Sequence, residues 1–546
     1  MPIPTASTAA KTATDYFGPD SFQYRAYDGA AYSAVVAAAI NVMQPTIDVD
    51  TDSNNNGLIE AIDDPIEMGD PGNIVQYNWN DDNGNGFADR SDPAPFVNGA
   101  GQPVSDDLDR ATLSTMLAPN GFTVELIKHG TQIKLWKTMD KQALPLTYTI
   151  GADTLPTQFY IEGYDYGQAT VEAVLKNPAG TVVHRDEIKV TVASVDLVGY
   201  RPQTEGPGYG NPFPKTAVPW QKESDPGIGI RKNGDDDDDD GVADLTSTDV
   251  DIAGENDLIE IGMRMEAGGA TGLQKVLRRG NAAINVFEGR DKFWPLLDSV
   301  DPTILVTPQL TVIKAWVEWV GAVPGSTELR LELQDARNGN TALVDSVVFH
   351  PFTSVVIAFG GNNNSPLDPT DGAFNIAEYL YEDGYDVHAY HEGIVDAIAR
   401  VPYHEVKDAI ERRGVTGVAI FGYSYGGGAT YLLAQQLKDN PPAGNWGLLF
   451  TAYIDAVVHD SFPPLSETGL PIDTLYHVNY YQSLDPLNGS PVAGAAANVH
   501  VTLTPWGAGL DHGTIDGHAN VQERIENGFD GPVDPQHDGL TDRVPR

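Results

Sequence analysis

The feature that most constrains the fold is the segment 415–427, which reads VTGVAIFGYSYGG. Four apolar residues (418–421) lead into G-Y-S-Y-G (422–426), and a helix-like segment follows. Such a turn needs glycines on both sides of the serine because its backbone is strained and closely packed. The pattern therefore predicts a strand, a sharp turn and a helix, with the hydroxyl of Ser424 raised at the end of a sheet.

The segments before this turn alternate between strand-like and helix-like patterns. Residues 354–359 predict a buried strand that ends in Gly-Gly-Asn (360–362), and a helix, a strand and a second helix follow up to about residue 413. This alternation indicates a parallel α/β sheet. From about residue 350 to 530 the chain resembles the α/β-hydrolase family. The resemblance implies an esterase-like or lipase-like serine hydrolase.

A serine becomes a nucleophile only beside a base and an orienting acid, which the family places downstream in the order acid, then histidine. Asp455 ends a buried strand and is the expected acid; Asp460, Asp473 and Asp485 are competitors on loops. His512 lies in the loop before a terminal helix, with Ile515 as the apolar residue of the family's His-x-x-Ile pattern. His518 remains an alternative base.

The expected oxyanion hole consists of backbone N–H groups. One belongs to Tyr425, directly after the serine, and the other to Gly361 or Asn362. The loop reads F-G-G-N-N-N and lacks the family's HGGG sequence, so the choice between the last two residues stays open.

Three acidic segments share the spacing of calcium-binding loops, with oxygen ligands at alternate positions and a glycine at the sixth. The candidate ligands are Asp52, Asn54, Asn56, Glu60 and Asp63 in the first loop, Asp81, Asn83, Asn85, Asp89 and Asp92 in the second, and Asp236, Asp238, Asp240 and Asp244 in the third. None carries the final glutamate of an EF-hand, so they resemble the shorter loops of dockerins and thrombospondin repeats. The spacing predicts structural calcium.

The middle of the chain contains an internal duplication. The segments that begin at Tyr160 and Trp316 both alternate apolar and polar residues and both turn at Asn- or Gly-rich sequences. Each follows an acidic segment, so the expected unit is a calcium loop with a small antiparallel β-sandwich. Residues 16–29, with the strand-like sequence after them, resemble the end of a bacterial cadherin-like tandem repeat. That resemblance implies the C-terminal part of a longer surface protein.

Composition limits the classes of function. The net charge of −44 argues against nucleic-acid and anionic-membrane binding. There is no cysteine, so disulfides are ruled out, and no run of eighteen apolar residues predicts a membrane span. The start of the sequence does not read as a secretory signal.

The resulting hypothesis is an extracellular or cell-surface serine hydrolase that cleaves carboxylic esters, with lipids and polymers as candidate substrates. The expected fold class is multidomain, with an α/β-hydrolase domain behind duplicated all-β modules. The expected parts are 1–45 (cadherin-like segment), 46–199 and 200–350 (calcium-loop and β-sandwich modules), 351–535 (α/β-hydrolase domain) and 536–546 (tail). One alternative is a calcium-dependent adhesin or surface-structural protein with a catalytically idle hydrolase-like domain. Another is a carbohydrate-active or peptide-bond hydrolase with the same triad. Oligomeric state is left open.

Overall fold

The computed structural model describes most, but not all, of the 546 residues. The described residues are 18–24, 36–42, 44–52, 59, 71–76, 96–97, 103–104, 108–199, 227–231, 258–289, 295–297, 303–306, 312–320, 325–361, 372–395, 400–457, 468–527 and 539–546. They divide into two compact units. The first is Met1–Val195 with Met265–Lys275 and Glu332–Val344, and the second is Asp196–Arg264 with Val276–Leu331 and Asp345–Arg546.

The first unit contains a β-sandwich. One sheet has the order β3-β7-β11-β9, with strands β3 (Thr46–Asp50), β7 (Leu108–Met116), β11 (Gln158–Gly163) and β9 (Ile133–Trp136). The facing strands are β10 (Thr147–Thr149), β8 (Thr123–His129), β12 (Gly167–Lys176), β13 (Val182–Gly199) and β4 (Asn73–Gln76). Buried residues of both sheets, such as Val49, Phe159 and Val171, form one hydrophobic core. The sandwich therefore closes on a core of its own.

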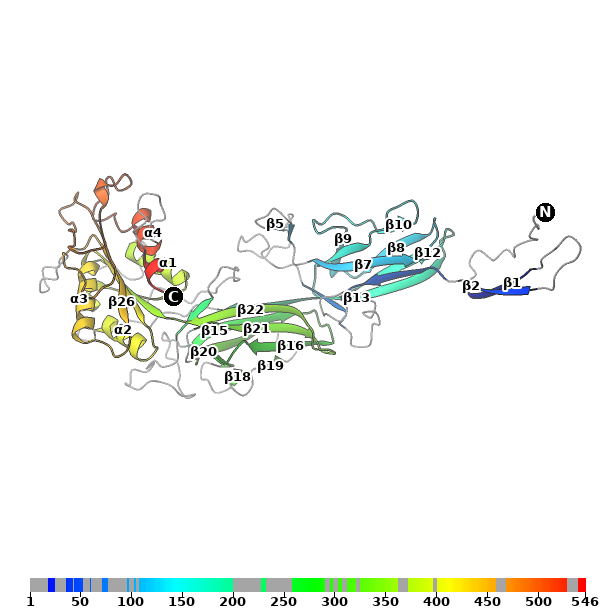
Figure 1. The fold of residues 1–546 in the computed structure, drawn as a ribbon, viewed down its shortest axis with the longest axis horizontal. Helices are drawn as coiled ribbons and strands as arrows, with labels where there is room; N and C mark the ends of the chain where they lie inside the picture. Colours follow the sequence, from blue (N-terminus) through cyan, green and yellow to red (C-terminus); the bar gives the residue numbers. More distant parts are fainter. Residues whose placement is uncertain are drawn as a thin grey trace, which may run out of the picture. The chain divides into compact units, whose positions relative to one another are not determined.

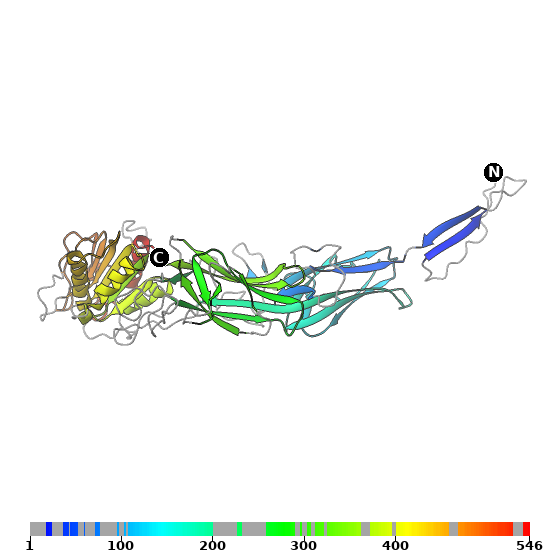
Figure 2. The same cartoon turned by 90° about the horizontal axis from the view of Figure 1, so that it is seen from below.

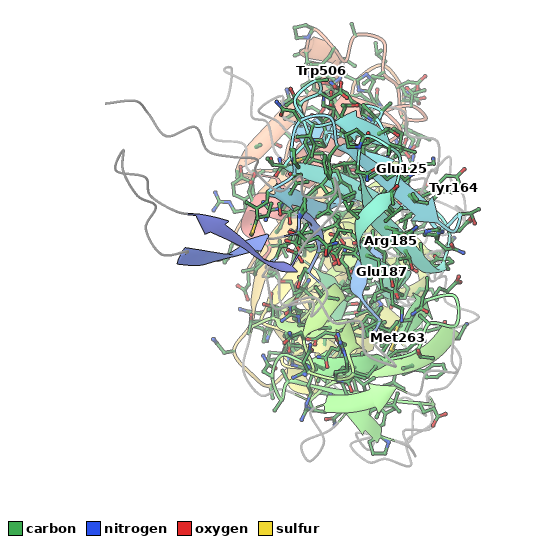
Figure 3. All side chains as sticks on the ribbon, turned by 90° about the vertical axis from the view of Figure 1, so that its right-hand side faces the viewer. Glu125, Tyr164, Arg185, Glu187, Met263 and Trp506 are labelled. Carbon is green, nitrogen blue, oxygen red and sulfur yellow. The ribbon has the colours of Figure 1, made fainter. Side chains whose placement is uncertain are left out.

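The outer face of the β8-β12-β13 strands carries ion pairs, because alternate residues of these strands point away from the core. Lys176 pairs with Glu125, and Glu172 pairs with both Arg185 and His129. Figure 3 labels Glu125 and Arg185 on this sheet. This side of the sandwich is polar and exposed to solvent.

Short strands complete the N-terminal part. β1 (Gly18–Tyr24) and β2 (Val36–Val42) pair antiparallel, as the two adjacent arrows in Figure 2 show. β5 (Phe96–Val97) and β6 (Pro103–Val104) form a second antiparallel pair.

The second unit begins with further β structure. The strands that lie wholly or mainly in it are β14 (Ile228–Ile230), β15 (Leu258–Glu266), β16 (Leu273–Arg279), β17 (Ile284–Phe287), β18 (Pro295–Leu297), β19 (Thr303–Val306), β20 (Val312–Trp319), β21 (Thr327–Asp335) and β22 (Thr341–Pro351). β20 pairs antiparallel with β15 on one side and with β17 on the other, and β17 pairs antiparallel with β18. β14 pairs with β22 in parallel, so the β structure is mixed rather than purely antiparallel.

After β22 the chain forms a six-stranded sheet in the order β24-β23-β25-β26-β27-β28, with every neighbouring pair parallel. The strands are β23 (Ser354–Phe359), β24 (Asp386–Tyr390), β25 (Gly417–Tyr423), β26 (Gly447–Ile454), β27 (His477–Tyr481) and β28 (Ala497–His500). The helices are α1 (Gly372–Glu382), α2 (Val401–Glu411), α3 (Tyr425–Asp439), α4 (Ala519–Asn527) and α5 (Leu540–Arg543), with 3-10 turns η1 (Glu392–Ile394) and η2 (Val501–Leu503).

Helices cover both faces of this parallel sheet (Figure 1). Val356 and Ala358 of β23 share a core with residues of α1, α4 and α5. Val355 and Ile357, which point the other way, share a second core with residues of α2 and α3. Burial on both faces explains why β23 and β25 are apolar throughout rather than alternating.

The expected fold class requires correction. We expected a multidomain chain with a C-terminal α/β-hydrolase domain behind duplicated all-β modules, but the described residues contain 28 strands and five α-helices, and most of their sheets are antiparallel or mixed. The reason is that period-two apolar patterns extend over far more of the described chain than helical patterns do. The chain is mostly β.

Candidate functional site

Ser424 lies at the junction of β25 and α3, with a backbone conformation of φ 54° and ψ −121°. Positive φ is costly for a non-glycine residue, by about 1–3 kcal/mol, and persists only where the surroundings enforce it. Three backbone bonds do so. The Ser424 N–H donates to the Ile454 carbonyl at 2.9 Å, and the Ser424 carbonyl accepts from the N–H groups of Gly427, at 3.0 Å, and Val457, at 3.2 Å. The strained turn is thus held from the neighbouring strand and from the helix.

The glycines on either side of Ser424 are required by close backbone packing. A Cβ on Gly422 would lie 2.1 Å from the Gly426 carbonyl oxygen, and one on Gly426 would lie 2.4 Å from the Phe359 carbonyl oxygen. Both distances are far below a van der Waals contact, so neither position accepts a larger residue without backbone movement.

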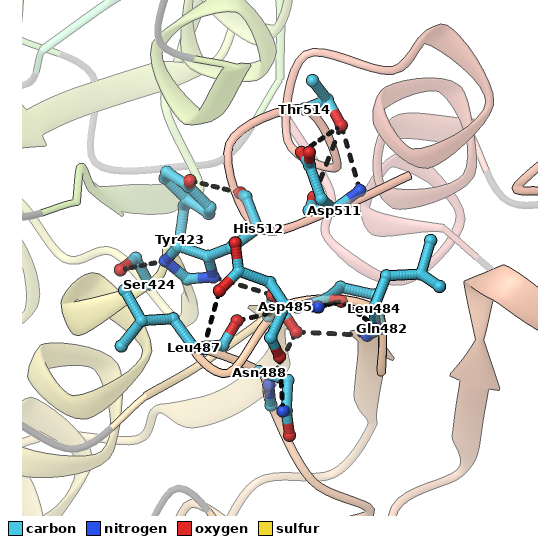
Figure 4. Close-up of polar contacts among 12 residues, drawn as sticks. Tyr423, Ser424, Gln482, Leu484, Asp485, Leu487, Asn488, Asp511, His512 and Thr514 are labelled. Carbon is cyan, nitrogen blue, oxygen red and sulfur yellow. Dashed lines mark hydrogen bonds and ion pairs between the residues drawn. The ribbon is translucent and has the colours of Figure 1, made fainter. Parts of the chain in front are cut away.

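Ser424 ends a two-step hydrogen-bonded relay, whose first step, between Ser424 and His512, is drawn in Figure 4. Its Oγ lies 2.8 Å from Nε2 of His512, and Nδ1 of His512 lies 2.7 Å from Oδ2 of Asp455. Because the ionised carboxylate only accepts, Nδ1 carries the proton and Nε2 is left to accept from the serine hydroxyl. Asp455 is fully buried and Ser424 is 5% exposed. The arrangement is able to remove a proton from Ser424 as its oxygen attacks an electrophile.

Ser424, His512 and Asp455, which the sequence analysis predicted as a set, lie together at one edge of the parallel sheet. Asp455 follows β26, Ser424 follows β25, and His512 lies in the loop between β28 and α4. Parallel strands end at one edge, which is why residues distant in sequence meet there. Their role as a catalytic set stays a proposal.

The competing residues lie elsewhere. The ring of His518 stacks on Trp506 at 5.5 Å, and its Nδ1 accepts from the Asn520 N–H. Asp473 pairs with Lys438 on the surface. Asp485 accepts from the Leu487 N–H within its own loop, and Asp460 lies outside the described residues.

Two further side chains contact the relay, and the sequence reasoning missed one of them, Gln482. The Tyr423 hydroxyl donates to the His512 carbonyl at 2.5 Å, and its ring lies 5.3 Å from the imidazole. Gln482, which follows β27, donates from Nε2 to Asp455 Oδ2 at 2.9 Å. Tyr423 had a local signal, its place beside Ser424; Gln482 had none, because only folding brings β27 beside β26.

The expected oxyanion donors are partly within the described residues. Gly361 packs against the serine, since a Cβ there would lie 3.3 Å from the Ser424 Cβ. Tyr425 is the first residue of α3, whose N-terminus carries partial positive charge. Asn362 lies outside the described residues. The assignment of Gly361 and Tyr425 as donors remains a proposal.

The predicted calcium ligands fall almost entirely outside the described residues. Asp52 is described and follows β3. The others lie in undescribed segments: Asn54, Asn56, Glu60, Asp63, Asp81, Asn83, Asn85, Asp89, Asp92, Asp236, Asp238, Asp240 and Asp244. Calcium therefore stays a proposal drawn from spacing.

A buried cluster near β24 has the composition of a metal site. Ligand atoms of Asp386, His388 and Glu405 lie within 4.8 Å of one another. Two guanidinium groups already contact these carboxylates: Arg231 is 3.0 Å from Asp386, and Arg413 contacts both Asp386 and Glu405. A metal cation would be repelled by both arginines, so the cluster fits an internal ion-pair network better than a metal centre.

The arginines determine the charge of Asp386. Burial opposes ionisation of this carboxyl, but Arg231 and Arg413 outweigh it and hold the pKa of Asp386 well below its usual range. Asp386 is therefore a permanent buried anion that two cations balance.

Among the residues that the structure describes, no helix is both long and apolar enough to cross a membrane.

Comparison with known proteins gives no family. No family model matches the chain, and no curated protein matches it. The solved structures similar to part of it include the C-terminal domain of the AgI/II polypeptide BspA from Streptococcus agalactiae, at 10% identity and a TM-score of 0.18, covering 56% of this chain and 99% of that one. The C-terminal domain of the antigen I/II-family protein AspA from Streptococcus pyogenes has 10% identity and a TM-score of 0.18, covering 57% and 100%.

A third similar structure holds fibronectin(III)-like modules of CbhA from Clostridium thermocellum, at 11% identity and a TM-score of 0.16, covering 51% of this chain and 89% of that one. At TM-scores this low the likenesses carry no argument, so the fold rests on the strand pairing described above.

These findings correct the family expectation. The resemblance to α/β-hydrolases and to cadherin-like repeats rested on short motifs, and no family model matches the chain. The preference for esters came from that resemblance, and a fold-level analogy does not establish an activity. The assignment as a carboxylic ester hydrolase, with its ester substrate, is therefore withdrawn. The chain is a mostly β protein with a hydrogen-bonded Ser424–His512–Asp455 relay at one sheet edge.

Proposed function

We propose that this chain is a surface-structural protein of bacterial cells, built from β modules. The observation that carries the proposal is the sandwich of the first unit, in which two sheets close on a continuous apolar core. Its outer face is covered by charged side chains such as Glu125, Glu172 and Arg185. A closed core with a charged surface suits a spacer module that remains soluble and stable outside the cell.

The acidic loops form part of the same proposal. The net charge of −44 includes three clusters whose like charges repel one another at close range. Bound calcium would neutralise them and stabilise the segments that carry them. Calcium then acts as a structural ion of the β modules.

Calcium titration of the intact chain tests this role. We expect calcium to raise the melting temperature and EGTA to reverse the change, while magnesium at the same concentration has a smaller effect. The triple change Asp236→Asn, Asp238→Asn and Asp240→Asn is expected to weaken the response, and Asp473→Asn, outside the clusters, serves as its matched control. An equal melting temperature with and without calcium would contradict the calcium part of the proposal.

A specific observation favours a second function for the last part of the chain, namely that Ser424 is a reactive nucleophile. Three features support it: the strained backbone of Ser424, the 2.8 Å contact with His512 and the 2.7 Å contact of His512 with Asp455. In this proposal His512 accepts the serine proton as the serine oxygen bonds to an electrophilic carbon or phosphorus. The bond from that atom to its leaving group breaks, and the imidazolium gives the proton to the leaving group, which for a fluorophosphonate probe departs as fluoride. Asp455 orients the imidazole.

Covalent labelling separates the two functions. A fluorophosphonate probe is expected to modify wild-type protein at Ser424 and to leave Ser424→Ala unmodified, with the site identified by peptide mapping. Ser483→Ala is the matched control, because Ser483 lies outside the relay and contacts His500. Absence of labelling in folded protein would contradict the nucleophile. Sustained turnover of a p-nitrophenyl ester that Ser424→Ala abolishes would instead contradict a purely structural role.

A further inference from the structure

The Asp455 carboxylate is unusual in how completely it is enclosed. It is fully buried, and its backbone has a φ of 46°. Oδ1 accepts from the N–H groups of Gln482, at 3.1 Å, and Gly489, at 2.7 Å. Oδ2 accepts from His512 Nδ1 and from Gln482 Nε2. The carboxylate is therefore held by four donors, and two of them belong to Gln482.

The Gln482 side chain uses its whole hydrogen-bonding capacity. Nε2 donates one hydrogen to Asp455 Oδ2 at 2.9 Å and lies 2.8 Å from the Leu487 carbonyl oxygen. Oε1 accepts from the N–H groups of Leu484, at 2.6 Å, and Asp485, at 3.0 Å. The amide is buried, with Gln482 only 1% exposed.

These contacts permit only one orientation of the amide. A rotated amide would place Oε1 against the Asp455 carboxylate and the Leu487 carbonyl, two groups that, like Oε1, only accept. It would also turn the amide nitrogen toward two N–H donors. The contacts thus fix Nε2 on the Asp455 side. Figure 4 draws Gln482 with its loop partners Leu484, Asp485 and Leu487.

The loop after β27 is organised around the same side chain. Gln482 bonds to the backbone of three of the next five residues, and Asp485 closes the loop by accepting from the Leu487 N–H at 2.9 Å. Gly489, at the end of the loop, then reaches Oδ1 of Asp455. A Cβ at Gly489 would lie 3.0 Å from this oxygen, so the loop fits closely around the carboxylate.

We propose that Gln482 is a positioning residue of the Ser424 relay: it holds the Asp455 carboxylate so that Oδ2 faces Nδ1 of His512. This inference rests on the proposed reactivity of Ser424. Gln482 touches neither the serine nor an electrophile, and it acts only through Asp455. Charge-assisted hydrogen bonds of this kind are the stronger ones in proteins, and their effect depends on fixed geometry.

The test is the kinetics of fluorophosphonate labelling, separated into the maximal rate constant kinact and the binding constant KI. Gln482→Met removes all the side-chain hydrogen bonds at similar volume. Gln482→Glu keeps acceptors for the Leu484 and Asp485 N–H groups and removes both Nε2 donations, the one to Asp455 and the one to the Leu487 carbonyl. We expect both variants to lower kinact about ten-fold to a hundred-fold and to leave KI within about two-fold.

The matched control is Gln436→Met. Gln436 is also buried, donates to the Val395 carbonyl at 2.8 Å and lies in α3 without a contact to the relay. We expect this control to keep the wild-type kinact. Melting temperatures of the variants show whether each remains folded.

A double-mutant cycle distinguishes positioning from general stabilisation. If Gln482 acts through Asp455, then Gln482→Met lowers kinact no further in a chain that already carries Asp455→Asn. Losses that multiply would overturn the inference, and so would wild-type kinact in Gln482→Glu. In either case a labelled wild type leaves the reactivity of Ser424 standing. An unlabelled wild type overturns both proposals together.

Discussion

The sandwich of the first unit and the parallel sheet of the second differ in how many faces of their strands are buried. In β8 the buried residues alternate with partly buried ones, and the outer face carries ion pairs. In β25 all seven residues are buried, because helices cover both faces. One sheet therefore has a solvated face that tolerates change, and the other has none.

This difference also determines where charges lie. On the sandwich, Arg185 and Glu172 pair at the surface. At the edge of the parallel sheet, Asp386 and Arg413 pair in the interior, with Arg231 completing the network. The same chemistry should therefore contribute very unequally to stability in the two regions.

The largest effect is expected from the buried network. Asp386→Ala leaves the Arg231 and Arg413 guanidinium groups buried without their anion, so we expect the free energy of unfolding to fall by about 3–5 kcal/mol. Urea denaturation of wild type and variant measures it, with hydrogen exchange of β23 and β24 peptides reporting the region. A loss below about 1 kcal/mol would show that the network is dispensable.

The next largest losses of stability are expected from substitutions of core residues in β25 and β8. Ile420 and Phe421 point to opposite faces of β25 and both are fully buried, so each change to alanine should cost about 2–5 kcal/mol. In β8, Leu126→Ala should cost a similar amount, whereas Ile127→Ala should cost about 1 kcal/mol or less. Denaturation of the four variants measures this. Equal costs at Leu126 and Ile127 would contradict the one-sided burial of the sandwich.

The two regions should also respond to pH with opposite signs. Burial raises the pKa of Asp109, in the sandwich, from 3.8 to about 6. The unfolded chain releases this proton first, so stability falls as the pH rises from about 4 through 6, by up to about 3 kcal/mol. Asp109→Asn should remove that loss.

In the parallel sheet, burial lowers the pKa of His477 from 6.5 to about 3. The unfolded chain binds this proton first, so stability falls as the pH drops from about 6.5 toward 3. His477→Gln should flatten this dependence. Hydrogen exchange of β7 and β27 peptides between pH 4 and 7.5 reports the two regions separately, and identical trends would contradict the prediction.

The smallest effect belongs to the surface pairs of the sandwich. Arg185 is 56% exposed, so Arg185→Ala should change the free energy of unfolding by about 1 kcal/mol or less. About 1 M NaCl should abolish this change in the free energy of unfolding, because salt screens exposed charges. The cost of Asp386→Ala should persist in the same salt. Urea denaturation at low and high salt measures both changes in the free energy of unfolding. If the loss in Arg185→Ala persisted in high salt, the Arg185–Glu172 pair would be less exposed to solvent than the sheet surface.

Part of this architecture was readable from local patterns. The apolar run and the glycines around Ser424 lie within thirteen residues, directly before a helix-like segment, so short-range sterics sufficed to predict the strained turn. The alternating segments near Tyr160 likewise indicated antiparallel strands, and β12 and β13 pair in that way. The step from one motif to a family failed, because a local turn does not define the remainder of a mostly β chain.

Local patterns were enough to identify the residue in the strained turn and the strands with one or two apolar faces, since both follow from nearest-neighbour geometry and side-chain period. Which groups meet at the turn depended on long-range folding. His512 is 88 residues from Ser424, Gln482 is 27 from Asp455, and Arg231 is 155 from Asp386. Such contacts depend on the order of the strands in the sheet and on how deeply a charge is buried, and a local sequence pattern predicts neither.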